Sequence, residues 1–173
     1  MLKFTSLIAG LIATAAPFAP AGAALIGPHA EECDGSKPAM VVHVEGLKSR
    51  TGILRVQLYG GDPARYFDKG TYLNRVEFKT PAAGPVEVCV PVPHPGVYAV
   101  SVRHDANGNG SVDIGSDGGG FSGNPSYSLF DAMFKRKPSP VAVQVHVAGG
   151  LVQVPVVLNY VRGGSLGPIG GAK

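Results

Sequence analysis

The sequence predicts an all-β fold: a single small antiparallel β-sandwich of about seven strands with one long irregular loop. Apolar residues recur at every second position in a series of short runs, which is the period of a half-buried strand. The 173-residue chain places 25 glycines and 15 prolines largely between these runs, where both residue types favour turns. Helical periodicity is scarce. Two packed antiparallel sheets are the architecture that this combination favours.

The first 23 residues are predicted to form a signal peptide and not to belong to the folded domain. Lys3 supplies a positive start, and residues 4–16 form an apolar run. Small residues then lead to a cleavage site that we expect after Ala23. The apolar run is short for a bilayer span, which disfavours the alternative of an uncleaved anchor. We therefore expect a periplasmic or secreted bacterial protein with no membrane span after signal cleavage.

Residues 24–39 are expected to form an N-terminal extension, and residues 40–160 the β-sandwich domain. Residues 161–173 contain five glycines and are predicted to be a flexible tail. Pro155 has no backbone donor, so its strand is expected at a sheet edge or with a bulge. Period-two alternation places the seven strands at residues 40–45, 54–58, 73–79, 86–90, 97–104, 141–147 and 152–158.

Residues 105–140 form a long irregular segment that is rich in glycine, asparagine and aspartate. A short helix is expected within it, around Leu129–Phe134. Loops of this length in a compact domain are usually functional or disordered. The segment is therefore where we look first for a site.

The two cysteines, Cys33 and Cys89, are predicted to form a disulfide. An even cysteine count in an exported protein favours a bridge, and a C-x-x-C redox spacing is absent. The bridge would tie the N-terminal extension to the predicted strand at 86–90. Two unpaired cysteines are the alternative, because sequence spacing alone does not establish proximity.

The strongest motif is D-A-N-G-N-G-S-V-D at residues 105–113, which matches the start of an EF-hand calcium loop. Alternating side-chain oxygens, with Gly110 at the sharp turn, suit a hard cation that prefers oxygen ligands. The twelfth position holds Ser116 instead of glutamate, and the preceding segment is a predicted strand, so no helix–loop–helix is expected. An Asx and glycine turn without metal is the alternative. The residues predicted to hold Ca²⁺ are Asp105, Asn107, Asn109, Ser111 and Asp113.

Other function classes receive less support. The formal net charge of +3 is too small to indicate a nucleic-acid partner. The G-x-S-x-G match at residues 163–167 has no acid or histidine after it to complete a hydrolase triad. The five histidines lack zinc-site spacing, and His104 is interpreted as a hydrogen-bonded histidine at a sheet end. No catalytic or cofactor-binding residue is therefore predicted.

Several local motifs together resemble a known bacterial family. They are P-G-V-Y-A-V at residues 95–100, H-D at 104–105, N-G-N-G at 107–110 and G-F-S-G-N at 120–124. Over roughly residues 40–160 the chain resembles domain-of-unknown-function family 2141. The resemblance implies an exported β-sandwich of the prealbumin or immunoglobulin type, and no established activity. The glycine-rich run at 115–120 is shorter than in this family, which leaves the shape of any pocket there open.

We therefore expect an uncharacterised exported β-sandwich module of the cell envelope. Its expected role is binding or structural, with a calcium loop and an unknown envelope protein or glycan as partner. The alternative is a hydrolase, or a carbohydrate- or peptide-binding module, that uses the 104–131 loop. A concave pocket beside Asp105 would favour a binder or an enzyme, and a convex loop a structural role.

Overall fold

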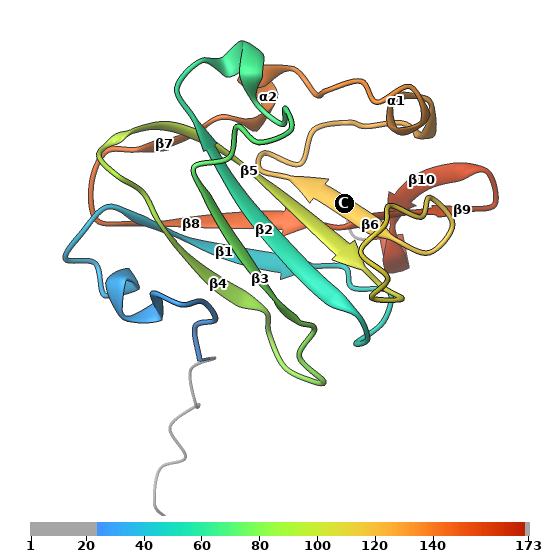
Figure 1. Cartoon of the computed structure of the whole chain (residues 1–173), viewed down its shortest axis with the longest axis horizontal. Coiled ribbons are helices and arrows are strands. Elements are labelled where there is room, and N and C mark those ends of the chain that lie inside the picture. Colours follow the sequence, from blue (N-terminus) through green and yellow to red (C-terminus); the bar gives the residue numbers. More distant parts are fainter. Residues whose placement is uncertain (1–23, 172–173) are drawn as a thin grey trace, which may run out of the picture.

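The computed structural model describes residues 24–171, which form two packed β-sheets of 3 and 7 strands. The predicted signal peptide lies outside the described residues. The smaller sheet has the strand order β4-β1-β8, and Figure 1 shows β1 and β8 passing behind the strands of the larger sheet. The strands of the smaller sheet are β1 (Ala39–Glu45), β4 (Glu87–Pro91) and β8 (Leu151–Val157).

The larger sheet has the order β10-β9-β6-β5-β2-β3, and β7 pairs with the start of β5. Two short helices, α1 (Leu129–Met133) and α2 (Pro140–Val143), lie in the connections. The strands of this sheet are β2 (Ile53–Gly60), β3 (Asn74–Lys79), β5 (Gly96–Asp105), β6 (Gly118–Phe121), β7 (Val145–Val147), β9 (Asn159–Arg162) and β10 (Ser165–Pro168).

One hydrophobic core fills the space between the two sheets. The predicted alternation places Met40 and Val42 of β1 against Val100 of β5 in a single buried cluster. All three side chains are 0% exposed, as a half-buried strand pattern requires on its inner face. The all-β sandwich prediction is confirmed.

Strand β8 departs from the predicted antiparallel pairing. It runs parallel to β1, with Met40 opposite Val152. Apolar alternation fixes which face a side chain occupies but does not fix the direction of the neighbouring strand, so this pairing was not readable locally. The edge position expected for Pro155 is confirmed, because β8 ends the sheet. After Leu158 the chain crosses into the larger sheet as β9.

The strand predicted at residues 141–147 is wrong in its first half, which forms α2. Pro140 lies at the start of this helical turn, where its fixed φ and missing N–H are tolerated. Val143 is buried against Tyr59 and Ala99, whereas Val141 is 81% exposed. The alternating valines therefore form a helical turn here, because the packing of Val143 onto β5 outweighs the strand preference of valine.

Three further strands, β6, β9 and β10, lie where no strand was predicted. Strand β6 interrupts the long irregular segment, and α1 within the same segment agrees with the predicted short helix. The described part of the predicted tail, residues 161–171, contributes the end of β9, strand β10 and a 3-10 turn, Ile169–Gly171. Glycine-rich runs give no period-two signal, which explains the omission of β6 and β10, and the four residues of β9 are too few to show one.

The N-terminal extension lies across β4 and is tied to it covalently. Ile26 pairs with Val88, donating its N–H to the carbonyl of Glu87 at 2.8 Å. A 3-10 turn at Ala30–Cys33 then brings Cys33 to Cys89, and the predicted disulfide is confirmed, with Cα atoms 5.9 Å apart. Cys89 is fully buried under the extension, on the face of β4 away from the main core.

Removing this bridge should destabilise the fold. The disulfide closes a loop with a sequence separation of 56 residues. A loop of that size corresponds to about 4 kcal/mol of chain entropy as an upper figure. The double substitution Cys33→Ser and Cys89→Ser should lower the free energy of unfolding in urea by up to that amount. Reductant should lower the stability of the wild type and leave the double variant unchanged. A wild type that is equally stable when fully reduced would contradict the prediction.

Candidate functional site

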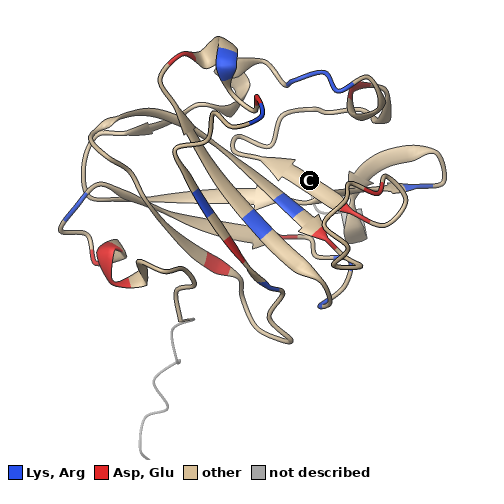
Figure 2. Ribbon diagram, in the orientation of Figure 1, with Lys and Arg blue, Asp and Glu red and all other residues tan. Residues whose placement is uncertain are grey.

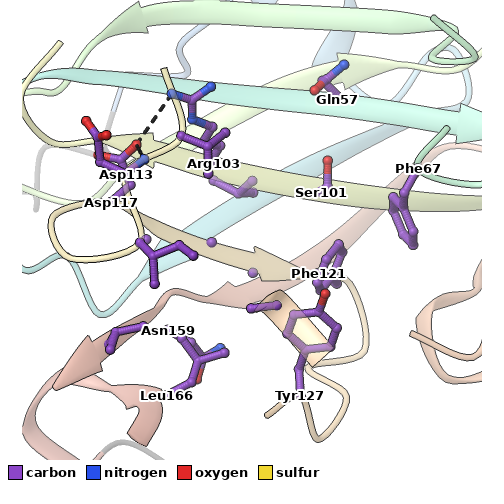
Figure 3. A pocket seen from close by; sticks show the side chains of 18 of the residues that line it. Gln57, Phe67, Ser101, Arg103, Asp113, Asp117, Phe121, Tyr127, Asn159 and Leu166 are labelled. Atoms are coloured by element: carbon purple, nitrogen blue, oxygen red, sulfur yellow. Dashed lines mark hydrogen bonds and ion pairs between the residues drawn. The ribbon is translucent and has the colours of Figure 1, made fainter. Parts of the chain in front are cut away.

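A groove of about 430 Å³ is hollowed into the outer face of the larger sheet, beside loop 105–117. Strands β5, β6 and β9 form its floor. In Figure 3, Arg103, Asp113 and Asp117 lie at one end of the groove, and Phe67, Phe121 and Tyr127 at the other. Figure 2 shows charged residues on β2, β3 and the end of β5, whereas β6 carries none. The groove therefore has an ionic end and an aromatic end.

Arg103 organises the ionic end. Its Nη2 donates to Oδ2 of Asp105 at 3.3 Å and to Oδ2 of Asp117 at 3.4 Å. The same nitrogen also donates to the carbonyl oxygen of Ser111. The carboxylates of Asp105 and Asp117 are only 7% and 5% exposed, so their charges need this partner. The guanidinium therefore links three parts of loop 105–117 by hydrogen bonds.

The predicted calcium residues meet in this one loop. Asp105 accepts the backbone N–H groups of Gly108 and Gly110, each at 2.8 Å. Oδ2 of Asp113 accepts side-chain N–H groups from Asn107 at 2.9 Å and from Asn109 at 2.6 Å. These two amides hold the pKa of Asp113 below its usual value. The side chains that the motif offers as ligands thus bond one another, and whether they also hold Ca²⁺ stays a prediction.

Two residues of the ionic end lay outside the predicted set. Asp117 accepts from the backbone N–H of Ala106 at 3.2 Å and from that of Asp113 at 3.1 Å, so it joins the two ends of the loop. Its signal in the sequence was its place one residue beyond the twelfth motif position. Arg103 left no such signal, because an outward-facing arginine on a strand resembles any solvated side chain.

A different group of side chains meets the distance criterion for a three-ligand metal site. Across residues 24–171, His29, Glu31 and Glu32 are the group whose ligand atoms lie within 4.8 Å of one another. They sit on the surface of the N-terminal extension, where His29 and Glu32 form an ion pair at 3.1 Å. Solvated acidic groups of this kind are common without metal, so the cluster adds no site.

Two of the three glycines of β6 are needed because a side chain would clash, and the third, Gly119, is not. A Cβ on Gly120 would lie 2.5 Å from the carbonyl oxygen of Val157, and one on Gly118 would overlap the ring of Tyr160. Both glycines are required by close packing. A Cβ on Gly119 would meet only Val102 O at 3.6 Å, an ordinary contact. Packing does not require glycine at 119, but a side chain there would stand on the groove floor.

The aromatic end is a chain of edge-packed rings. Phe67 lies 4.9 Å from Tyr59 and 4.8 Å from Phe121, and Phe121 lies 5.4 Å from Tyr127. Phe67 has a φ of 65°, in the left-handed region that a bulky residue rarely adopts. Backbone strain of this kind gathers at ligand and active sites. The strained turn directs the Phe67 ring into the groove.

His104 lies beneath the ionic end and is fully buried, as part of the core packing. Its Nδ1 bonds the hydroxyl of Tyr160 at 2.6 Å, and its Nε2 lies 2.8 Å from the carbonyl oxygen of Thr51. Burial raises the pKa of Tyr160 to about 12, so the phenol stays protonated. His104 is the hydrogen-bonded histidine at a sheet end that the sequence suggested.

Comparison with known proteins gives a family and no activity. The model of a family described as "Uncharacterized protein conserved in bacteria (DUF2141)" matches residues 42–154, which include all of the predicted calcium residues. Neither a curated protein nor a solved structure matches the chain. Among residues 24–171, no helix has the length and apolar character needed to cross a bilayer.

Substitutions in β6 should separate the two glycine roles. Gly120→Ala should lower the free energy of unfolding in urea by about 1–3 kcal/mol, because the methyl group overlaps the Val157 carbonyl. Gly119→Ala should be neutral or stabilising by up to about 1 kcal/mol, because alanine loses less backbone entropy in a strand. Equal losses at the two positions would show that Gly119 is also needed for packing.

Proposed function

We propose that the chain, which belongs to the uncharacterized bacterial family DUF2141, is a binding module of the cell envelope whose ligand occupies the groove beside loop 105–117. The groove is the observation that carries this proposal. Its volume of about 430 Å³ falls in the range of small-molecule sites. Its walls are mostly apolar, with a few polar groups among them, which is the composition of a ligand pocket.

The empty floor at Gly119 supports the same function. Glycine in the interior of a strand costs stability, and such a residue often marks a place where a ligand approaches the backbone closely. On β6, Gly119 stands between Arg103 of β5 and Asn159 of β9. A side chain at this point would divide the groove. The absence of one keeps the two ends joined as a single binding surface.

An envelope location fits the chemistry of the chain. The disulfide is stable in oxidising compartments and is rare in the reducing cytosol. The N-terminal segment has the composition of a secretory signal. A hydrolase in the same groove has less support, because the described lining residues include no histidine that could act as a base for its serine, Ser101.

Nile red tests the groove directly. This uncharged dye fluoresces strongly in apolar surroundings, and the native protein should bind it at micromolar concentration. Gly119→Leu should weaken binding by about tenfold or more, because leucine fills the floor. The fold should tolerate the change, since a Cβ at 119 makes only an ordinary contact. Fluorescence titration of the folded protein gives both dissociation constants.

Two control variants separate the groove from the rest of the surface. Gly149→Leu makes the same chemical change in an exposed turn with open space around the added Cβ. Phe134→Ser removes a ring that is 58% exposed outside the groove. Both should bind the dye like the wild type. Dye binding that survives Gly119→Leu but falls in Phe134→Ser would place the apolar site at the exposed ring after the end of α1 and refute the proposal.

We propose in addition that loop 105–117 binds one Ca²⁺. The supporting observation is a charge imbalance: the loop carries three carboxylates, those of Asp105, Asp113 and Asp117, and the one guanidinium beside it, that of Arg103, pairs with Asp105 and Asp117. Excess negative charge on clustered oxygens favours a divalent cation. The guanidinium competes for the same oxygens, and a bidentate glutamate is missing. Binding should therefore be weak, in the range of about 10⁻³ M.

A melting experiment tests the calcium proposal. If the dissociation constant is about 10⁻³ M, tenfold that concentration of calcium should raise the melting temperature by roughly 4 °C. Asp113→Asn should abolish the increment with little effect on the calcium-free fold, because Asp113 bonds the side chains of its own loop. Magnesium at equal concentration is the control for ionic strength. An unmoved wild-type curve would refute calcium binding.

A further inference from the structure

The polar groups of the groove reveal which ligand chemistry it can accept. Most of them already have partners. Asn159 Nδ2 donates to the carbonyl oxygen of Val157 at 3.2 Å, and the Tyr127 hydroxyl donates to that of Arg136 at 2.6 Å. Both oxygens of Asp117 accept two hydrogen bonds each. A glycan needs many free donors and acceptors, so this lining fits it poorly.

The atoms left over include a buried donor, Nε of Arg103, and two acceptors. Oδ1 of Asp113 and Oδ1 of Asn159 take part in none of the hydrogen bonds found among residues 24–171. In Figure 3 these two side chains lie on opposite sides of strand β6, and Asp113 is the one beside Arg103 and Asp117. The free carboxylate oxygen of Asp113 calls for a ligand that donates hydrogen bonds at the ionic end. An ammonium group carries three donors and no acceptor.

The charge of the lining favours the same ligand. Among the described residues of the groove, Arg103 is the one base, and Asp113 and Asp117 are the acids. Arg103 is bound to Asp105 and Asp117, so its charge is already neutralised. Asp113 makes no ion pair within the described part of the chain. An anionic ligand would meet net repulsion, whereas a cation would meet an unpaired carboxylate.

Resting on the proposed function, we propose that the ligand is an apolar organic amine, bound with its ammonium group at the carboxylate of Asp113. Its apolar body extends over Gly119 toward the rings of Phe67 and Phe121. The exposed side chains of Val112 and Ile114 flank the ionic end and cover the ligand there. The floor accepts a flat or linear body because no Cβ rises from Gly119.

Competition against Nile red tests this ligand class with three probes of equal chain length: decylamine, decanol and decanoate. All measurements use the full mature protein in EDTA, which keeps calcium out of the loop. Decylamine should displace the dye at about fivefold lower concentration than decanol, the ratio that a partly exposed ion pair supports. Decanoate should be weaker than decanol. Equal displacement by all three, or a preference for decanoate, would overturn the inference.

A variant pair locates the preference. Asp113→Asn should abolish the advantage of decylamine over decanol, measured as the ratio of their displacing concentrations on the same variant, because the unpaired carboxylate is removed. Glu31→Gln makes the same charge change on the exposed N-terminal extension and should keep the advantage. An advantage that survives Asp113→Asn overturns the assignment. Absent Nile red binding in the wild type refutes the proposed function itself, whereas dye binding without an amine preference refutes the ligand class alone.

Discussion

Strand β6 packs against Val157 and Tyr160 so closely that a side chain at Gly118 or Gly120 would not fit. A Cβ on Gly120 would lie 2.5 Å from the Val157 carbonyl, and a Cβ on Gly118 would enter the ring of Tyr160. This contact lets β6 lie between β5 and β9, so the larger sheet continues to β10. Without it the sheet would end at β5 and the groove would have no floor. The glycine run is thus a structural requirement and the source of the groove.

The ionic loop depends on that same strand. Gly118 pairs with His104 and Gly119 with Arg103, which places Asp117 directly beside the guanidinium. The buried charges of Asp105 and Asp117 are satisfied by one arginine, and a loop with little apolar content is ordered by hydrogen bonds instead. Its outer side chains, Val112 and Ile114, remain free to form a wall of the groove. The loop and the groove therefore both depend on the pairing of β5 with β6.

Elements whose signal is local were predictable. Period-two alternation located β1, β2, β3, β4, β5 and β8 to within a few residues, because one face of each strand contacts the core. The two cysteines gave the disulfide. Strands β6 and β10 were missed because their glycines carry no hydrophobic pattern, and β9 was missed because its four residues are too few to show one. Alternating valines misled at α2, where Val143 packs onto β5 in a helical turn.

The sequence by itself determined the sandwich class, the disulfide partners and the loop in which polar side chains gather. These follow from residue type and short-range spacing. Only the tertiary structure decided that β8 runs parallel to β1, that Arg103 lies among the loop carboxylates, and that Gly119 opens a groove between Asp113 and Phe121. Strand direction and the partner of a charge depend on residues far apart in the chain, and local patterns carry no record of that proximity.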